Sequence, residues 1–321
     1  MIQVKNITKR FGTTLAVDGV SFDVPQGQVV GFLGPNGAGK STTMRVLTGY
    51  LPPDDGEAQI LGIDLSDSLA IRRRLGYIPE NNPLPEDIEV TDYLHFIGQL
   101  RGLHNPAERM ERVKRVLKLC SLAQGVGKKI GELSKGFRQR VGLAQAIIHD
   151  PDILILDEPT SGLDPNQVQE VRALIHDLKK QKTLLISTHI LTEVQQTCDR
   201  ILIINKGKIV GDGTPHDLTG AMQNVNRLFV SLKGPHDAVK SRLGALQGIR
   251  SLRGESMNGE DGFIVETDAS RDVREEVFRI SVEENWPILA MNQNRLSLED
   301  VFRALTQEQT ENGHKQAAAG V

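Results

Sequence analysis

The sequence has few cysteines, no excess of basic residues and no long apolar run, and each absence narrows the class of protein. Its two cysteines, Cys120 and Cys198, cannot form a disulfide framework, and no metal-type spacing surrounds them. We expect two buried thiols in a reducing compartment. A net charge of −3 over 321 residues gives no global basic field that would attract nucleic acid. The triplet Arg72-Arg73-Arg74 is interpreted as a solvated helix face.

Signals for secretion and for membrane insertion are also missing. No stretch approaches the roughly 18 consecutive apolar residues that span a bilayer. The N-terminal sequence MIQVKNITKRFG lacks the apolar core of a signal peptide. These features predict a cytoplasmic protein, and they are compatible with a membrane-embedded partner.

The order of apolar and amphipathic segments predicts an α/β fold. Short apolar strands alternate with turns in the first third of the chain, around a helix in AGKSTTMRVLTGYL that ends near Gly49. Charged amphipathic helices fill the stretch from Val90 to Asp150. The strand in PDILILDEP, a helix beginning at Pro165, the strand KTLLIST and a hairpin turning on Lys206-Gly207 follow. This alternation favours a mostly parallel sheet with an inserted helical block.

The remainder of the chain predicts a smaller α+β unit. Its segments run strand, helix, strand, strand, helix, strand, which fits a ferredoxin-like two-layer arrangement. A last helix is opened by Ser297, with Asp300 at the capping-box spacing. We therefore expect a first domain, a helical subdomain within it, a second domain and a disordered tail, at residues 1–220, about 88–150, 225–306 and 307–321.

The stretch GFLGPNGAGKST places a phosphate-binding loop (P-loop) between a strand and a helix. It contains the pattern Gly34-x-x-x-x-Gly39-Lys40-Ser41, whose glycines let consecutive backbone amides point toward phosphates. Lys40 is placed to neutralise β and γ oxygens, and the Ser41 hydroxyl to ligate Mg²⁺. The candidate nucleotide-binding residues are Gly34, Pro35, Asn36, Gly37, Ala38, Gly39, Lys40, Ser41 and Thr42.

The stretch ILILDEP supplies carboxylates at the end of a buried strand. The unbroken apolar run from Ile153 to Leu156 is typical of a buried parallel strand. Asp157 and Glu158 stand at its carboxyl end, where ligands bind in open α/β sheets. Asp157 is expected to reach Mg²⁺ through water, and Glu158 to polarise an attacking water as a general base or positioning group. Adjacent carboxylates are often plain surface charge, but the P-loop in the same chain favours the functional interpretation.

A third candidate site begins the helix in GELSKGFRQRVGLAQAI. Ser134 opens an amphipathic helix, and Gly136 and free backbone amides accompany it. A hydroxyl, a glycine and bare amides at a helix N-terminus suit an anion. These residues alone do not say which anion, or whether it is held by this chain or by another.

Together these motifs resemble the ATP-binding subunit of an ABC (ATP-binding cassette) transporter, over roughly Ile2 to Leu218. The resemblance implies a P-loop NTPase fold with a RecA-like core, an antiparallel β part and a helical subdomain, and it implies ATP and Mg²⁺ as cofactors. It also implies a head-to-tail homodimer. Ser134 and Gly136 would there bind the γ-phosphate of an ATP held by the P-loop of the opposite subunit.

The same resemblance assigns further residues. Phe11 matches an aromatic that stacks on adenine, although it can also be an ordinary strand-end phenylalanine. His189 matches the switch histidine that contacts the γ-phosphate and the Glu158 region, although lone histidines are more often surface or core residues. Asp164 matches a loop that crosses the dimer interface. With Glu158, His189 completes the candidate catalytic pair.

Three positions depart from the usual family pattern. Lys135 and Phe137 stand where glycine and glutamine are common, and Glu80 stands where most relatives have a glutamine that ligates Mg²⁺. A glutamate can still ligate Mg²⁺, but it adds negative charge near the γ-phosphate. With GYIPE and a trailing LEDVF, these features resemble the type-2 exporter branch, which includes drug, polysaccharide and gliding-motility-associated ATPases.

That branch implies separately encoded integral membrane subunits as partners. They would be reached through the Glu80 loop and the segment up to about Leu94, and they would place the chain at the inner face of the cell membrane. Three alternatives stay open: an import-type ATPase with a regulatory C-terminal domain, a soluble ABC protein acting on ribosomes or DNA, and a nucleotide-gated switch that does not hydrolyse ATP.

Overall fold

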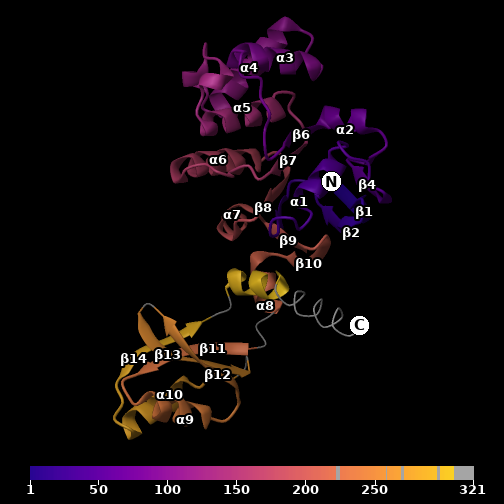
Figure 1. Cartoon of the computed structure of the whole chain (residues 1–321). Helices are drawn as coiled ribbons and strands as arrows, with labels where there is room; N and C mark the ends of the chain where they lie inside the picture. The colour runs from indigo at the N-terminus through magenta and orange to yellow at the C-terminus, as the bar shows by residue number, and fades with distance from the viewer. Residues whose placement is uncertain (222–224, 258, 269–270, 295–296, 307–321) are drawn as a thin grey trace. The chain divides into compact units, whose positions relative to one another are not determined.

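The computed structural model describes residues 1–221, 225–257, 259–268, 271–294 and 297–306. It divides the chain into two compact units, Met1–Thr214 and Pro215–Val321 (Figure 1). The tail expected to be disordered, residues 307–321, lies outside the described residues. Within the described part, no helix has the length and apolar character needed to cross a bilayer.

An antiparallel sheet forms one layer of the first unit. Its strands have the order β2-β1-β4-β5, and they comprise β1 (Ile2–Phe11), β2 (Thr14–Val24), β4 (Asp55–Ile60) and β5 (Ile63–Asp64). Buried and exposed residues alternate along β2 toward its end, because successive side chains of a strand point to opposite faces. The buried face belongs to a core shared with the second sheet, since Val20 and Phe22 of β2 cluster with Phe32 and Leu202.

The second sheet is the mostly parallel one that the sequence predicts. It has the order β10-β9-β3-β8-β7-β6, with strands β3 (Val29–Leu33), β6 (Leu75–Ile78), β7 (Ile153–Asp157), β8 (Thr183–Thr188), β9 (Arg200–Asn205) and β10 (Lys208–Gly213). Only β10 runs antiparallel to its neighbour. Every residue of β3, β7 and β8 is buried, as the apolar residues at 153–156 in β7 and 184–186 in β8 suggest. The carboxyl ends of these strands therefore meet at one edge.

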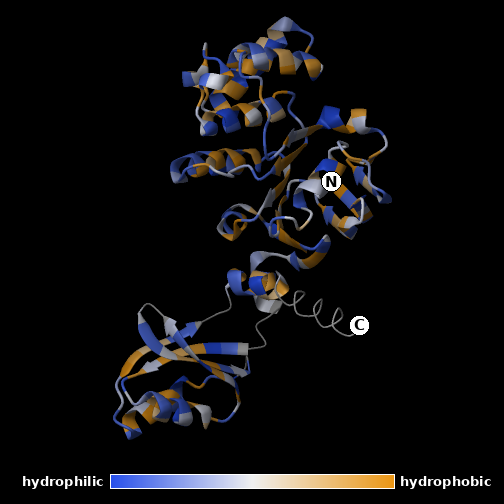
Figure 2. Ribbon diagram, viewed as in Figure 1, coloured by the Kyte–Doolittle hydropathy of each residue, from blue (hydrophilic) through white to orange (hydrophobic). Residues whose placement is uncertain are grey.

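Helices cover this sheet and form the inserted block. They are α1 (Lys40–Leu47), α2 (Ser68–Arg74), α3 (Val90–Leu100), α4 (Pro106–Leu119), α5 (Lys135–Ile147), α6 (Pro165–Leu178) and α7 (Leu191–Thr197), with short 3-10 turns at Ala123–Gly125 and Ile130–Glu132. Helices α3, α4 and α5 pack together at one end of the unit (Figure 1). Figure 2 shows apolar and polar residues interleaved along α4, α5 and α6, the pattern of amphipathic helices.

Local sequence explains where several helices begin. The Asn105 side chain accepts the Ala107 N–H at 2.9 Å, just before Pro106 at the first helical position of α4. Asp164 plays the same part for α6 by accepting the Gln167 N–H at 2.9 Å. The arginine triplet ends α2 with all three residues exposed, as a solvated face requires. Both cysteines are buried, and burial raises the pKa of each thiol to about 12.

From β11 to β14 the second unit runs strand, helix, strand, strand, helix, strand. Its elements are α8 (Pro215–Ala221), β11 (Val225–Leu232), α9 (His236–Gly244), β12 (Ile249–Met257), β13 (Glu260–Asp268), α10 (Arg274–Glu283) and β14 (Ile288–Asn294), followed by helical residues 298–306. The sheet order is β12-β13-β11-β14, and every pairing is antiparallel. Leu228, Val230, Phe263 and Val265 of the sheet share a core with Val277 of α10.

Candidate functional site

The P-loop joins β3 to α1, and two of its glycines are required by close backbone contacts. A Cβ on Gly34 would lie 2.4 Å from the Ile204 carbonyl oxygen. A Cβ on Gly39 would lie 2.4 Å from the Ala16 carbonyl oxygen, and Gly39 also has φ of 109°. Side chains at either position would push the loop off the sheet edge. The loop therefore holds its backbone amides close against β2 and β9, directly before the N-terminus of α1.

The Lys40 ammonium is fixed inside this loop. Its side chain is 6% exposed, and Nζ donates to the carbonyl oxygens of Gly34 at 2.8 Å and Pro35 at 3.2 Å. Nζ also lies 3.4 Å from Glu158 Oε1. A positive charge is thus presented at the N-terminus of α1, where the helix dipole and free amides already favour an anion.

Asp157 and Ser41 offer oxygens suited to a divalent cation. Ser41 Oγ donates to Asp157 Oδ1 at 3.2 Å, and the Ser187 hydroxyl donates to the same oxygen. Among the described residues, the buried Asp157 Oδ2 has no hydrogen-bond partner. Burial raises the Asp157 pKa, hydrogen bonds from Ser187 and Ser41 oppose this shift, and Glu80 and Glu158 add to it. A hard cation would satisfy the unpaired oxygen and favour the ionised carboxylate, so these residues fit Mg²⁺.

Glu158 contacts His189 at the end of the next strand. Glu158 Oε2 lies 2.8 Å from His189 Nδ1, and the Glu158 side chain is 6% exposed. The Glu158 N–H donates to the Ser187 carbonyl oxygen at 3.0 Å and to the Ser187 hydroxyl at 3.2 Å. Glu158 has φ of 50°, which is uncommon for a residue with a side chain. Left-handed backbone of this kind persists where the surrounding structure holds it, and it is concentrated at active sites.

Lys40, Ser41 and Glu158 line one cleft of about 280 Å³, and Asp157 and His189 contact two of these lining residues. The cleft is lined by Ala16, Asn36, Gly37, Gly39, Lys40, Ser41, Thr42, Glu80 and Glu158. Its lining thus combines residues of the P-loop, of the loop after β6 and of the loop after β7. Glu80, predicted from the resemblance alone, lies beside the P-loop.

Nine predicted residues do not line this cleft. Five of them belong to the P-loop or contact a lining residue, namely Gly34, Pro35, Ala38, Asp157 and His189. The other four are Phe11, Ser134, Gly136 and Asp164. Phe11 is 49% exposed at the end of β1, with the Lys9 ammonium 6.0 Å from its ring centroid. Ser134 caps α5, and its hydroxyl accepts the Phe137 N–H at 3.4 Å. Gly136 packs against Gln167, since a Cβ there would lie 2.4 Å from the Gln167 side-chain carbon. Asp164, on the neighbouring loop, is exposed.

Sequence reasoning missed part of the site. Ser187 and Thr188 end the apolar strand β8 and are fully buried. Polar residues directly after an apolar run could have indicated buried hydrogen bonds at this end of the strand. Thr160 and Glu193 are also buried and bonded to each other. Glu193 carries no such signal, because a glutamate on a helix of seven residues normally faces solvent.

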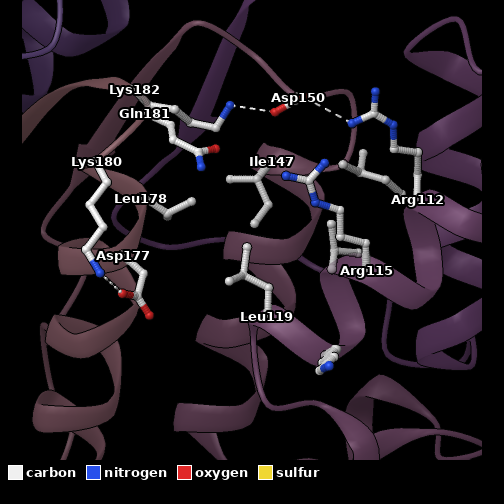
Figure 3. A pocket seen from close by; sticks show the side chains of 13 residues that line it. Arg112, Arg115, Leu119, Ile147, Asp150, Asp177, Leu178, Lys180, Gln181 and Lys182 are labelled. Atoms are coloured by element: carbon white, nitrogen blue, oxygen red, sulfur yellow. Dashed lines mark hydrogen bonds and ion pairs between the residues drawn. The ribbon is translucent and has the colours of Figure 1, made fainter.

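A larger cavity lies elsewhere, between α4, the end of α5 and the end of α6 (Figure 3). Its volume is about 580 Å³, and its lining combines apolar residues with several lysines and arginines. The most buried of these cations, Lys182, donates to Asp150 at 2.7 Å and to the Pro151 carbonyl oxygen at 2.7 Å. Arg112 binds the same Asp150 at 3.1 Å. Both cations are already paired with Asp150, whereas the smaller cleft is lined by the P-loop, so the smaller cleft is the candidate nucleotide site.

Comparisons with known proteins identify the family of the chain. Residues 17–161 match the family described as ABC transporter. The chain is 36% identical over 262 residues to a Nod factor export ATP-binding protein I of Burkholderia lata, covering 80% of this chain and 84% of that protein. It is 38% identical over 213 residues to the bacitracin transport ATP-binding protein BcrA of Bacillus licheniformis, covering 65% and 68%.

A solved structure confirms the predicted cassette fold. The dimeric structure of a post-hydrolysis state of the ATP-binding cassette MJ0796, bound to ADP and Pi, has a TM-score of 0.61 and 26% sequence identity. It covers 67% of this chain and 98% of that chain. Together with the family match and the identity over most of an export ATPase, this similarity leads to one conclusion. The chain belongs to the ABC transporter family, as an ATP-binding and ATP-hydrolysing subunit.

Proposed function

We propose that two copies of this chain enclose ATP and Mg²⁺ and that hydrolysis drives export through separate membrane subunits. The observation that carries the proposal is that Lys40, Ser41 and Glu158 line one cleft, with Asp157 hydrogen-bonded to Ser41. These groups provide a cation for phosphate, oxygens for a metal and a base for water. Few other reactions require all three within one cleft.

The P-loop residues hold the phosphates. Lys40 and the backbone amides of the loop neutralise the β and γ oxygens, while Ser41, Asp157 and Glu80 hold Mg²⁺. When bound, Mg²⁺ supplies positive charge that stabilises the phosphoryl oxygens during transfer. The unpaired Asp157 Oδ2 supports this ligand set.

Glu158 and His189 act on the attacking water. A phosphate in the loop would compete with Glu158 for the Lys40 ammonium and free Glu158 Oε1 for a water molecule. The water oxygen forms a bond to the γ-phosphorus while the bond between the γ-phosphorus and the β–γ bridging oxygen breaks. ADP leaves with the bridging oxygen, and Glu158 accepts the water proton. His189 Nδ1, 2.8 Å from Glu158 Oε2, fixes the direction of the carboxylate.

The residues outside the cleft support a dimer. Ser134 and Gly136 open α5 with a hydroxyl and free amides, yet they do not line the P-loop cleft of their own chain. A head-to-tail pair would bring these groups to the γ-phosphate of the partner, with Asp164 and its loop at the interface. Because each chain carries both half-sites, two identical nucleotide sites would form.

Exposed apolar residues follow the Glu80 loop and supply a docking surface for membrane subunits. Ile88, Phe96 and Leu100 are 40%, 55% and 66% exposed. The guanidinium of Arg101, which ends α3, binds the carbonyl oxygen of Arg72 on α2, so this surface is tied to the core of the unit. Docking here would place the chain at the inner face of the membrane and would transmit changes at Glu80 to the transport path.

Two measurements test the proposal. Glu158→Gln should lower kcat for ATP hydrolysis about 10²- to 10⁴-fold while nucleotide binding persists, because only proton acceptance is lost. Equal hydrolysis by both proteins would show that Glu158 is not the base. A mild-detergent pull-down from native membranes should copurify an integral membrane protein without a P-loop. Recovery of ribosomal proteins or DNA instead would favour a soluble ABC protein.

A further inference from the structure

A buried carboxylate on α7 connects the two loops that carry Glu158 and His189. Glu193 is 6% exposed. Its Oε1 accepts a hydrogen bond from the Thr160 hydroxyl, and its Oε2 accepts one from the Thr188 hydroxyl at 2.9 Å. Thr160 follows Glu158 by two residues, and Thr188 directly precedes His189. One side chain therefore bridges the segments on both sides of the Glu158–His189 contact.

The bond to Thr188 fixes the backbone around His189. While the Thr188 hydroxyl donates to Glu193, it accepts the Ile190 N–H at 3.0 Å. A hydroxyl has a single proton, and the Thr188 hydroxyl donates it to the Glu193 carboxylate. The lone pairs of the Thr188 oxygen are then available to accept the Ile190 N–H. The residues before and after His189 are thereby held to α7, and this fixes the backbone from which the His189 imidazole extends.

The bond to Thr160 stabilises the loop on the other side. Glu158 has φ of 50°, and the Ser161 N–H donates to the Glu158 carbonyl oxygen at 3.1 Å. The Leu163 N–H donates in turn to the Thr160 carbonyl oxygen at 3.2 Å. This tight turn keeps a strained residue in place only if the turn itself is anchored. The Glu193–Thr160 hydrogen bond is such an anchor.

The two hydrogen bonds to Thr160 and Thr188 are the close contacts that stabilise the buried Glu193 carboxylate. Arg172 Nη2 lies 4.0 Å from Glu193 Oε1, beyond direct hydrogen-bond distance, and Arg172 Nη1 donates to the Gln196 side-chain oxygen at 2.8 Å. Burying a carboxylate without a close ion pair is costly, and an apolar side chain would fill the same space at lower cost. Two directional acceptors are what an apolar residue cannot provide.

We propose that Glu193 is a positioning residue for ATP hydrolysis, which holds Thr160 and Thr188 so that Glu158 and His189 stay in contact. Glu193 does not line the nucleotide cleft, so it acts on the reaction only through these neighbours. The inference rests on the proposed roles of Glu158 and His189.

The first test compares Glu193→Ala with Val194→Ala. Val194 is the next residue on α7, is fully buried and packs against the Gly31 position on β3. Its apolar side chain cannot accept a hydrogen bond from either threonine. We expect Glu193→Ala to lower kcat about 10- to 100-fold with nearly unchanged affinity for a fluorescent ATP analogue, because misplaced reacting groups slow the chemical step. Val194→Ala should lower the melting temperature and leave kcat near wild type. Loss of kcat to the same degree in both variants would overturn the proposal.

The second test is a double-mutant cycle with His189→Ala. If Glu193 acts through the Glu158–His189 contact, its loss should lower kcat less than about 3-fold once His189 is gone, because residues that act as a unit are non-additive. A general structural defect would instead multiply the two effects. Thr160→Val and Thr188→Val remove the same hydrogen bonds without removing the carboxylate, and each should lower kcat in the same direction if Glu193→Ala does not fold.

These outcomes separate the inference from the proposed function. Wild-type kcat in Glu158→Gln and His189→Ala would reject the proposed catalytic site. Loss of kcat in those two variants, with wild-type kcat in Glu193→Ala and in both threonine variants, would reject only the positioning role.

Discussion

The Lys40 ammonium lies 3.4 Å from the Glu158 carboxylate, and each side chain is only 6% exposed. The cation of the P-loop and the candidate base therefore form a buried pair. Either group alone would be a buried charge with reduced compensation, which is strongly unfavourable. This relationship links nucleotide binding to the position of the base.

Replacing Lys40 should therefore affect both binding and stability. We expect Lys40→Ala to weaken ATP binding at least about 10-fold, since a charge-assisted hydrogen bond contributes about 1.5–3 kcal/mol. It should also lower the melting temperature without nucleotide, because Glu158 loses its cation. Titration with a fluorescent ATP analogue and thermal unfolding check the two effects. Lys208→Ala, which removes an exposed lysine paired with Asp18, should change neither.

The raised pKa of Asp157 predicts a conflict between stability and function. A carboxyl whose pKa is higher in the folded protein destabilises the fold once pH exceeds its ordinary pKa of 3.8. Asp157→Asn should therefore unfold at a higher temperature than wild type at pH 7 while losing Mg²⁺-dependent hydrolysis. The difference in melting temperature should shrink as pH falls toward 4, because Asp157 then becomes protonated. A variant less stable than wild type at pH 7 would contradict this account.

The pKa of Asp150 is shifted in the opposite direction to that of Asp157. Hydrogen bonds from Lys182 and Arg112 lower its pKa to about 2 against the opposing effect of burial. Asp150 thus contributes stability above its ordinary pKa of 3.8, and this contribution disappears as pH falls through about 2. Its side chain is 40% exposed, so after screening we expect Asp150→Asn to cost about 1 kcal/mol or less at pH 7. Urea unfolding at low and high salt checks this, with the effect smaller at high salt.

The glycines of the P-loop should respond differently to alanine. At Gly34 a Cβ would lie 2.4 Å from a backbone oxygen, whereas at Gly37 nothing lies within 4 Å but φ is 78°. We expect Gly34→Ala to lower stability severely and Gly37→Ala to cost only about 1–3 kcal/mol for its backbone conformation. Both should weaken ATP binding. Comparison of their unfolding free energies checks the order, and equal losses would show that the loop moves away from Ile204 freely.

The sequence was most informative where chemistry and local structure depend on neighbouring residues. Glycine spacing before Lys40, the unbroken apolar run before Asp157 and the proline at the start of α6 each have a local physical cause, and the structure has these elements where expected. The short strand β6 was not predicted, because four residues carry little periodicity.

Contacts between distant segments could not be predicted in this way. Glu193 is buried because α7 packs beside the ends of β7 and β8, and nothing in its neighbouring residues indicates this. Sequence patterns report which face of an element is apolar, but they do not report which loops meet at that face. The same limit applies to Ser134, whose proposed ligand belongs to a second chain.

The proposed head-to-tail dimer can be tested by mixing two variants, which no single variant can do. In such a dimer each nucleotide site combines Lys40 of one chain with Ser134 of the other. A Lys40→Ala chain and a Ser134→Arg chain should each be nearly inactive alone, the first for lack of phosphate binding and the second because a bulky cation blocks α5. Mixed together, they can form a heterodimer with one intact site and one site defective on both sides.

We therefore expect ATPase activity to appear on mixing the two inactive chains. If the chains pair at random at a 1:1 ratio, about half of the dimers are mixed, and each mixed dimer has one intact site of two. About a quarter of all sites are then intact, so the ATPase activity should approach about a quarter of wild type if the sites act independently. Mixing Lys40→Ala with Glu158→Gln is the matched control, because Lys40 and Glu158 face the same cleft of one chain. That mixture leaves no intact site and should stay inactive. Recovery in both mixtures, or in neither, would contradict a site shared between two chains.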